Sequence, residues 1–234
     1  MEITHQQDLI KTKILHGEYL NNLYFSSCNF HYISIPKVAN TSIKICIAFS
    51  LNLLTNSDKL KIQQQPNLIH KLNTKKVNLS FFDQEFCEFT LVRDPIERFV
   101  SFYKDKILGN GWPDTVKERY MKIYGLNPNQ DIDNNIKVIC DIPDVHSEIH
   151  FRSQSQIIKQ SKLSKNLKIF SYKNFQLFKD YLAKSIKKKF NKEIYPLGHF
   201  QRSKQSTAIS LSSVSINKLK SRYKKDYELI EHLT

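Results

Sequence analysis

Residues 30–49 read FHYISIPKVANTSIKICIAF and carry the clearest fold signal in the chain. Its first six residues, 30–35, are mostly β-branched or aromatic and carry no formal charge, which predicts a buried strand. From Thr41 to Leu54 apolar residues recur at helical spacing, which predicts a helix directly after the strand. The intervening residues PKVAN, at 36–40, must therefore turn the chain from a strand into a helix.

Further strands and helices follow from the same kinds of pattern. The expected strands cover 85–92 (EFCEFTLV) and 167–172 (LKIFSY), and the expected helices cover 95–108, 175–185 and the C-terminal stretch 216–230. The helix at 95 has a well-marked start, because Asp94 can cap it, Pro95 suits its first position and Glu97 completes a capping-box spacing.

Strands that alternate with helices predict an α/β fold, here a P-loop-like parallel β-sheet flanked by helices on both faces. In such sheets, ligands bind beyond the carboxyl ends of the strands. The 234 residues are enough for one domain with a real core. We therefore expect a single domain over 1–234, with a helical N-terminal extension over 1–29 and the main body over 30–234.

The charge of the chain is concentrated near its C-terminal end. Residues 1–150 hold 17 basic and 17 acidic side chains, whereas residues 151–234 hold 19 basic and 5 acidic ones, so the last third carries the whole net charge of +14. Such a field attracts anions, including nucleic acids, acidic membranes, acidic polysaccharides and multiply charged cofactors. A lysine-rich solvated surface explains the charge equally well, so charge alone does not choose a partner.

The four cysteines form no CxxC pair, and three of them lie in apolar surroundings and are expected to be buried thiols, which favours a reducing compartment. We find neither the pattern of a signal peptide nor a stretch long enough for a transmembrane helix. The sequence therefore predicts a cytoplasmic protein without a membrane anchor.

The loop PKVAN and the helix after it form the first candidate binding motif. A tight turn here would aim backbone N–H groups at a point before the helix, where the helix dipole also favours an anion. Lys37 can add a full charge, and Thr41 and Ser42 can add hydroxyl donors. The Walker pattern GxxxxGK[ST] is absent, which disfavours a P-loop kinase. The loop has no glycine, but Asn40 tolerates positive φ better than most residues do. The alternative is an ordinary strand-to-helix connection.

The second motif is RDPIERFVSFYKDK at 93–106, which begins where the second strand ends. The planar guanidinium of Arg93 suits bidentate phosphate binding, and the hydroxyl of Ser101, eight residues further on, can add a hydrogen bond. The alternative is that the arginines of this motif pair with nearby Asp94, Glu97 or Asp105.

Together the two motifs resemble those of the sulfotransferases that use 3′-phosphoadenosine 5′-phosphosulfate (PAPS), and most closely those of the carbohydrate sulfotransferase branch. PKVANTSIK is similar to the family's 5′-phosphosulfate loop, and RDPIERFVSFYKDK is similar to its 3′-phosphate motif. Softer similarities are HFRSQ at 150–154, LKIFSYKNFQLFKDYL at 167–182 and YKKDYELI at 223–230. The similarity covers about residues 30–232. Asn40 replaces a more usual glycine or cysteine, and Ser153 stands where proline is common.

The resemblance implies an enzyme that passes the sulfuryl group of PAPS to a hydroxyl, by in-line displacement that releases 3′-phosphoadenosine 5′-phosphate (PAP). Lys37 would stabilise the bridging oxygen, and the N–H groups from Ala39 to Ser42 would hold the 5′-phosphate. Arg93 and Ser101 would hold the 3′-phosphate. The full expected donor site is Lys37, Val38, Ala39, Asn40, Thr41, Ser42, Arg93, Ser101 and Arg202.

A general base should take the acceptor proton, and the resemblance places His150 in this role, with Lys37 as the second catalytic residue. His146 and Glu148 are rivals. The spacing of His146 and His150 would put both on one face of a helix, but the zinc protease pattern requires Glu directly after the first His, where Ser147 stands. We therefore expect no metal.

The resemblance implies a carbohydrate hydroxyl as the acceptor, whereas the sequence itself leaves polysaccharides, oligosaccharides, protein tyrosine and small alcohols open. It contains no nucleic-acid recognition motif, so no nucleic acid partner is expected. If the acceptor is an acidic glycan, the lysine-rich stretch 184–192 could hold it, and Arg202 or Lys204 could reach the acceptor or the 3′-phosphate. Two other functions stay open: a basic nucleic-acid-binding protein, and a non-catalytic relative of the sulfotransferases that binds a nucleotide or glycan. The sequence does not decide the oligomeric state.

Overall fold

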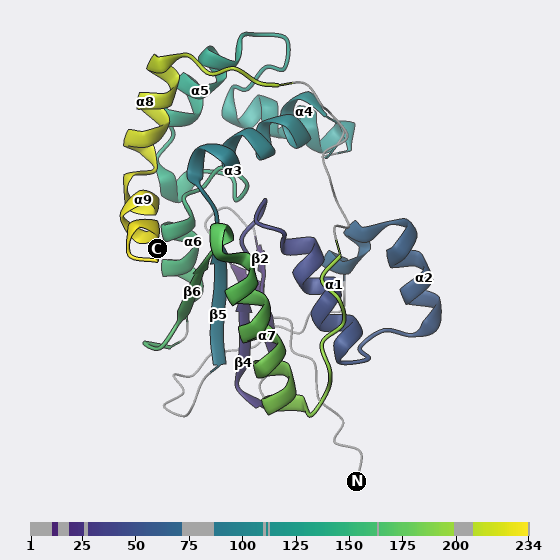
Figure 1. Ribbon diagram of the computed structural model, residues 1–234. Coiled ribbons are helices and arrows are strands. Elements are labelled where there is room, and N and C mark those ends of the chain that lie inside the picture. Colours follow the sequence, from purple (N-terminus) through teal and green to yellow (C-terminus); the bar gives the residue numbers. More distant parts are fainter. Residues whose placement is uncertain are drawn as a thin grey trace. The chain divides into compact units, whose positions relative to one another are not determined.

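The computed structural model describes residues 11–13, 19–25, 28–71, 87–109, 111, 113–162, 164–198 and 208–233. The chain divides into two compact units, each built from two stretches of sequence (Figure 1). The first unit consists of Met1–Val92 and Ile158–Arg202, and the second of Arg93–Ile157 and Ser203–Thr234. The predicted single domain is not tested by this division and stays a prediction.

A four-stranded sheet forms the centre of the first unit. Its strands, in spatial order, are β3 (Leu23–Phe25), β4 (Phe30–Ile33), β5 (Cys87–Val92) and β6 (Lys168–Ser171). The pairs β4–β5 and β5–β6 are parallel, whereas β3 runs antiparallel to β4. The predicted α/β class is thus confirmed, but the sheet is mixed rather than wholly parallel. The reason is that β3 and β4 are joined by a short connection, which favours an antiparallel pair.

The N-terminal part of the first unit contains strands where the sequence predicted a helical extension. A separate antiparallel pair is formed by β1 (Lys11–Lys13) and β2 (Tyr19–Asn21), and β3 follows. The prediction for 1–29 is therefore wrong for residues 11–13 and 19–25. Pairing between strands overrides the weak helical period of this segment.

Both faces of the four-stranded sheet are covered. On one face, the ring of Phe30 lies 5.1 Å from that of Phe89 and 5.3 Å from that of Phe190 of α7 (Phe175–Phe190). On the opposite face, Nδ1 of His31 lies 2.8 Å from Oε1 of Glu88, and both side chains are buried. Aromatic packing on one face and a buried polar pair on the other explain why the strands contain almost no exposed residue.

The other helices of the first unit are α1 (Asn40–Ser50), α2 (Asn56–Gln64), the 3₁₀ helices η3 (Pro66–Lys71) and η6 (Tyr172–Asn174), and the end of α6 (Gln154–Ser161). Both α1 and α2 pack against η3, whereas η6 packs against α7. Ile45 and Ala48 of α1 form a core with Ile62 of α2 and Ile69 of η3. The helix predicted from Thr41 is confirmed, although it ends four residues early, at Ser50.

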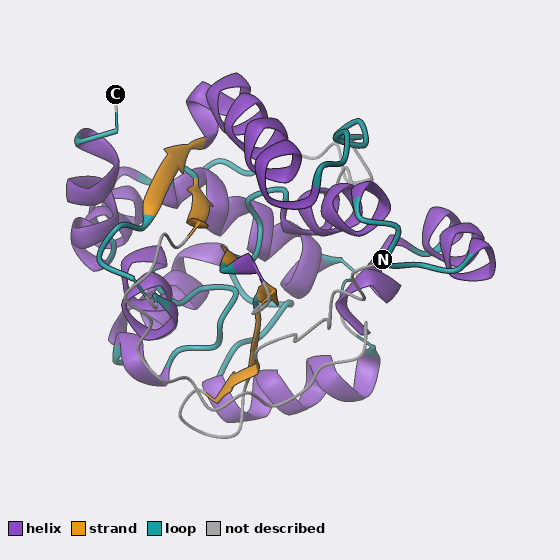
Figure 2. Cartoon of the chain, turned by 90° about the horizontal axis from the view of Figure 1, so that it is seen from below, coloured by secondary structure: helices purple, strands orange, loops and turns teal. Residues whose placement is uncertain are grey.

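Among the residues that the structure describes, all elements of the second unit are helices. Figure 2 shows the helices and strands of the whole chain in different colours. The elements of the second unit are α3 (Pro95–Phe102), the π-helix η4 (Tyr103–Leu108), α4 (Asp114–Tyr124), α5 (Ile132–Asp141), the 3₁₀ helix η5 (Asp144–His146), α8 (Ser213–Arg222) and α9 (Lys224–Glu231). Phe99, Phe102 and Tyr103 anchor its core, and Leu219 and Tyr223 of the C-terminal helices pack against them.

The predicted start of α3 is confirmed. Asp94 is the N-cap, its Oδ1 accepts the N–H of Glu97 at 2.9 Å, and Pro95 occupies the first turn. The single helix predicted for 95–108 passes into the π-helix η4 at Tyr103, and the predicted C-terminal helix is broken at Tyr223. None of the four cysteines forms a disulfide. None of the described helices is long and apolar enough to cross a membrane.

Candidate functional site

The loop between β4 and α1 has an unusual backbone. Lys37 and Ala39 both adopt the left-handed conformation, with φ of 69° and 61°. Left-handed and right-handed residues in succession turn backbone N–H groups toward one side, which makes a concave site for an anion. The sequence suggested positive φ at Asn40, which is wrong because Asn40 already begins α1. Holding an L-residue in this conformation costs about 1–2 kcal/mol, and such strain is concentrated at binding sites.

This strain gives a prediction for Ala39→Gly. Because glycine adopts positive φ without a clash with Cβ, we expect the variant to raise the free energy of unfolding by about 1 kcal/mol, or the melting temperature by about 2–4 °C. Ala48→Gly is the matched control, because Ala48 is buried within α1 and should lose about 1–2 kcal/mol instead. Loss of stability in Ala39→Gly, measured by thermal unfolding, would contradict the left-handed assignment.

The first turn of α1 is suited to an anion. Its N-cap, Ala39, has no side chain that could cap the N–H groups, and no acidic residue lies in the first turn. The donors of Asn40, Thr41 and Ser42 and the positive end of the helix dipole therefore point to the loop. Lys37 is half-buried beside these groups, whereas the Val38 side chain is fully buried, so only the backbone of Val38 can contribute.

A histidine that sequence reasoning missed contacts this loop. Nε2 of His70, on η3, lies 3.0 Å from Oγ1 of Thr41. His70 is half-buried and lies in a polar stretch of mixed composition, 29 residues after Thr41. Its sequence context carries no signal for this contact, since only the packing of η3 against α1 brings the two side chains together.

The second group of candidate residues belongs to the second unit. Arg93 follows β5 directly, and its Nε donates to Oε2 of Glu97 at 2.9 Å. The side chain of Glu97 is 58% exposed, so this ion pair is worth at most about 1 kcal/mol and a phosphate could displace it. Ser101 is half-buried two turns along α3.

The other arginine of this motif has a structural role. Arg98 is buried, and it donates to the carbonyl oxygens of Arg152 at 2.8 Å and Ile149 at 3.0 Å. These bonds hold the segment 147–155, which also carries the candidate base. Arg93 is therefore the arginine of the motif that is suited to a ligand.

His150 and Glu148 form a pair. Nδ1 of His150 lies 2.7 Å from Oε1 of Glu148, whose Oε2 accepts the backbone N–H of His150 at 2.7 Å. Glu148 is almost fully buried, while the His150 side chain is 21% exposed. The carboxylate thus orients the imidazole and leaves proton exchange with a ligand to Nε2. The third rival, His146, lies exposed at the end of η5.

Several features of the predicted site lie elsewhere or are not described. Arg202 and Lys204 lie outside the described residues.

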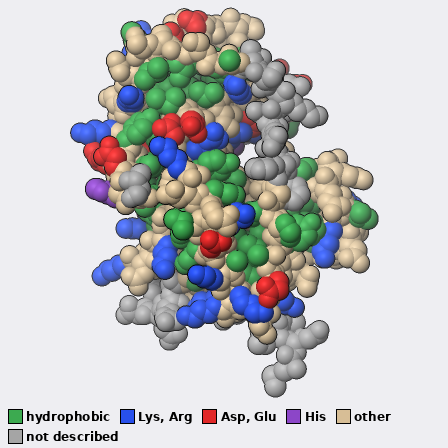
Figure 3. Space-filling view, in the orientation of Figure 1, with side chains coloured by type: hydrophobic (Ala, Val, Ile, Leu, Met, Phe, Trp, Pro, Cys, Tyr) green, Lys and Arg blue, Asp and Glu red, His purple; other side chains and the backbone are tan. Residues whose placement is uncertain are grey.

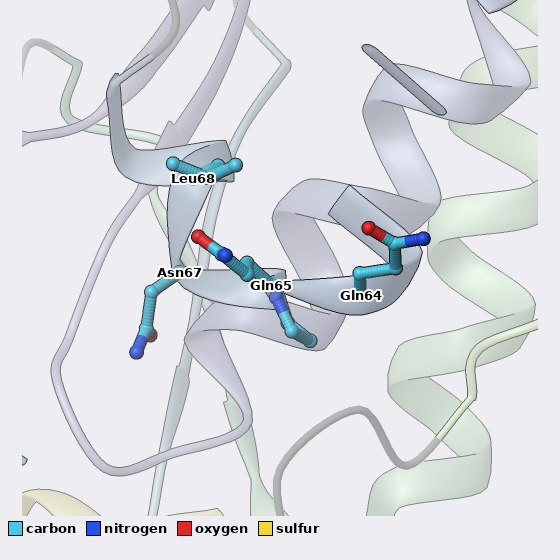
Figure 4. A pocket seen from close by; sticks show the side chains of 5 residues that line it. Gln64, Gln65, Asn67 and Leu68 are labelled. Carbon is cyan, nitrogen blue, oxygen red and sulfur yellow. The ribbon is translucent and has the colours of Figure 1, made fainter. Parts of the chain in front are cut away.

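Within the described ranges, no group of three or more His, Cys, Asp or Glu side chains could hold a metal ion. A pocket at the junction of α2 and η3 is lined by Gln64, Gln65, Pro66, Asn67 and Leu68 (Figure 4). It has no charged side chain and does not match the donor site.

The structure brings together Lys37, Thr41 and His70 in the first unit, and places Arg93 and the Glu148–His150 pair in the second. A strand, a strained turn with a lysine and a helix without a side-chain cap, at the carboxyl end of a sheet, form an arrangement that favours an anion in α/β proteins.

The chain belongs to the sulfotransferase family, whose model matches residues 23–231. It is also similar to carbohydrate sulfotransferase 14 of Mus musculus, with 31% identity over 78 residues. These residues make up 33% of this chain and 21% of the mouse protein, so the match spans about a fifth of that relative's length. No solved structure matches the chain. The family and the relative confirm the resemblance inferred from the two motifs and support a sulfotransfer activity.

Proposed function

We propose that this protein transfers the sulfuryl group of PAPS to a carbohydrate hydroxyl and releases PAP. The observation that carries the proposal is the loop 36–42, where two left-handed residues precede an uncapped helix within the family match. This donor set is chemically suited to a phosphosulfate, because it offers N–H groups, two hydroxyls and one full positive charge, and no carboxylate.

The donor is assigned to two groups of residues. The N–H groups from Ala39 to Ser42 bind the 5′-phosphate, and Lys37 stabilises the bridging oxygen as negative charge develops there. Arg93 and Ser101 bind the 3′-phosphate, which distinguishes PAPS from ordinary adenine nucleotides. Arg202 is assigned to the same phosphate from the sequence resemblance alone.

In the transfer step, the acceptor oxygen forms a bond to sulfur while the bond from sulfur to the bridging oxygen breaks. The bridging oxygen keeps the electron pair and leaves on PAP, and the acceptor proton passes to a base. His150 fits this role because Glu148 orients its ring, and His70 fits it because it contacts Thr41 of the donor loop. Both assignments are proposals, and single variants distinguish them.

We expect one of the two variants His150→Ala and His70→Ala to lower kcat by about 10²–10⁴-fold, because a general base contributes that much to a proton transfer. Binding of PAP should change little in the same variant, since the base acts on the acceptor. His146→Ala is the matched control, because His146 is exposed, and it should keep its activity. Full activity in both of the first two variants would exclude His150 and His70 as the base.

The lysine-rich stretch suits only a long acceptor. Lys184, Lys187 and Lys188 are exposed on the C-terminal half of α7, and Lys and Arg side chains gather over this helix (Figure 3). However, Phe190 at the end of α7 packs on Phe30, which begins β4, whereas Lys37 follows the end of that strand. The lysines therefore lie at the opposite end of the sheet from the donor loop. A polymer could reach both places, but a small sugar could not.

The test is transfer of labelled sulfate from PAPS to four acceptors: an acidic polysaccharide, a neutral polysaccharide, a tyrosine peptide and a small alcohol. Incorporation into a polysaccharide supports the proposal. Exclusive labelling of the peptide or alcohol contradicts the carbohydrate acceptor. PAP binding without transfer to any of them would favour the non-catalytic alternative, and salt-sensitive binding of DNA or RNA without PAP binding would favour the nucleic-acid alternative.

A further inference from the structure

The side-chain amide of Gln154 forms hydrogen bonds with both the backbone N–H and the backbone C=O of Arg93. The N–H of Arg93 donates to Oε1 of Gln154 at 2.9 Å, and Nε2 of Gln154 donates to the carbonyl oxygen of Arg93 at 2.8 Å. Gln154 is fully buried, at the start of α6 and 61 residues away in the sequence. Two hydrogen bonds to one residue fix both its position and its orientation.

Arg93 occupies the junction between a strand and a helix. The paired residues of β5 and β6 end at Val92 and Ser171, and α3 begins at Pro95. Arg93 therefore lies where the strand pairing has ended and the helix has not yet begun, and its backbone N–H and C=O both bond to Gln154 there. The Gln154 amide takes the place of one further strand residue, so the stem of the arginine leaves the backbone at a fixed point.

Gln154 is itself held by a buried carboxylate of the C-terminal helix α9. Oδ2 of Asp226 accepts the backbone N–H of Gln154 at 2.9 Å, and Oδ1 accepts the N–H of Ser155 at 2.8 Å. Nε2 of Gln154 also lies 3.5 Å from the same Oδ2. Asp226 is fully buried, and burial raises the pKa of its carboxyl. The chain of contacts thus runs from Asp226 through Gln154 to the backbone of Arg93.

We propose that Gln154 is a positioning residue for the 3′-phosphate site, which sets the backbone of Arg93 and is held in turn by Asp226. The inference rests on the proposed function, because it assigns the guanidinium of Arg93 to the 3′-phosphate. It makes a distinct claim, namely that selectivity for the 3′-phosphate depends on a side chain that never touches the ligand.

The test compares the dissociation constants of PAP and AMP, which differ only in the 3′-phosphate. Gln154→Met keeps the length of the side chain and removes both hydrogen bonds. We expect it to weaken PAP binding about tenfold, since a displaced arginine loses part of its charge-assisted contact, and to leave AMP binding unchanged. Gln156→Met, on the same helix and half-buried, is the matched control and should keep the preference for PAP.

The outcomes separate this inference from the function on which it rests. If the wild type binds PAP no better than AMP, the proposed function fails. If the wild type prefers PAP, Arg93→Ala loses the preference and Gln154→Met keeps it, the positioning role is overturned. A purely structural role would lower the melting temperature of Gln154→Met and leave the ratio of the two constants unchanged. If Gln154→Met does not fold, Asp226→Asn provides the same comparison with a smaller expected fall, and an unchanged ratio there also overturns the inference.

Discussion

Lys37→Met is expected to lower kcat for sulfate transfer by about 10²–10³-fold, which is the effect of removing one donor that stabilises charge in a transition state. Methionine keeps the aliphatic stem and removes the ammonium group. The bridging oxygen would then leave without a neutralising charge. PAP binding should fall less than kcat does, because the charge on this oxygen is largest during transfer.

Lys61→Met is the control for Lys37→Met, since Lys61 is an exposed lysine of α2 in the same unit. It should keep both its activity and its affinity for PAP. Equal losses of kcat in the two lysine variants would mean that catalysis depends on the overall positive charge of the surface and not on the position of Lys37. Full activity in Lys37→Met would remove Lys37 from the catalytic machinery.

Lys44→Met is expected to stabilise the folded protein at pH 7 by an amount on the order of 4 kcal/mol. Lys44 is only 1% exposed, in the middle of α1. Burial lowers the pKa of its ammonium group from 10.5 to about 7. Folding therefore requires this lysine either to lose its proton or to be buried with its charge, and both lower the stability of the folded state. Methionine has a similar length and no charge, so it avoids both losses of stability.

The pH dependence of stability follows from the same shift in the pKa of Lys44. Between about pH 7 and 10.5 the unfolded chain holds a proton on Lys44 that the folded chain has lost. Wherever the unfolded state binds more protons, stability rises with pH, here by up to about 1.4 kcal/mol per pH unit. Below pH 7 both states are protonated, so the contribution of Lys44 becomes flat.

Chemical unfolding of the wild type and Lys44→Met from pH 6 to 10 measures this linkage. The difference in stability between them should shrink as the pH rises. Lys61→Met should follow the wild type, because Lys61 is exposed. A Lys44→Met variant that is less stable than the wild type at pH 7 would contradict the account and show that the Lys44 ammonium is stabilised by a charge in the folded protein.

Local patterns were enough to predict the central strands and their order in the chain. β4, β5 and β6 are short segments rich in β-branched and aromatic residues, and this enrichment favours a strand over a helix. β3 was missed because three residues, Leu23–Phe25, are too short to show a period. Its antiparallel pairing with β4 depends on a neighbouring strand in the sheet. The strand propensity of individual residues does not predict which strands pair.

The candidate site was predicted as a set of residue types and only partly as geometry. Composition pointed to Asn40 for the left-handed turn, but the packing of the loop places Lys37 and Ala39 there. The contacts of His70 with Thr41 and of Gln154 with Arg93 join residues 29 and 61 positions apart. Such side-chain contacts arise from tertiary packing and cannot be predicted from the spacing of residues in the sequence.

The most direct test of the central claim is thermal stabilisation by PAP, with ADP and ATP as controls, on the wild type and on Arg93→Ala. PAP at about 100 times its dissociation constant should add about 2.7 kcal/mol to the stability of the wild type, or about 5–10 °C to its melting temperature. We expect a weak shift with ADP and loss of the PAP shift in Arg93→Ala. No shift of the wild type at PAP concentrations that stabilise other sulfotransferases would contradict the proposed function.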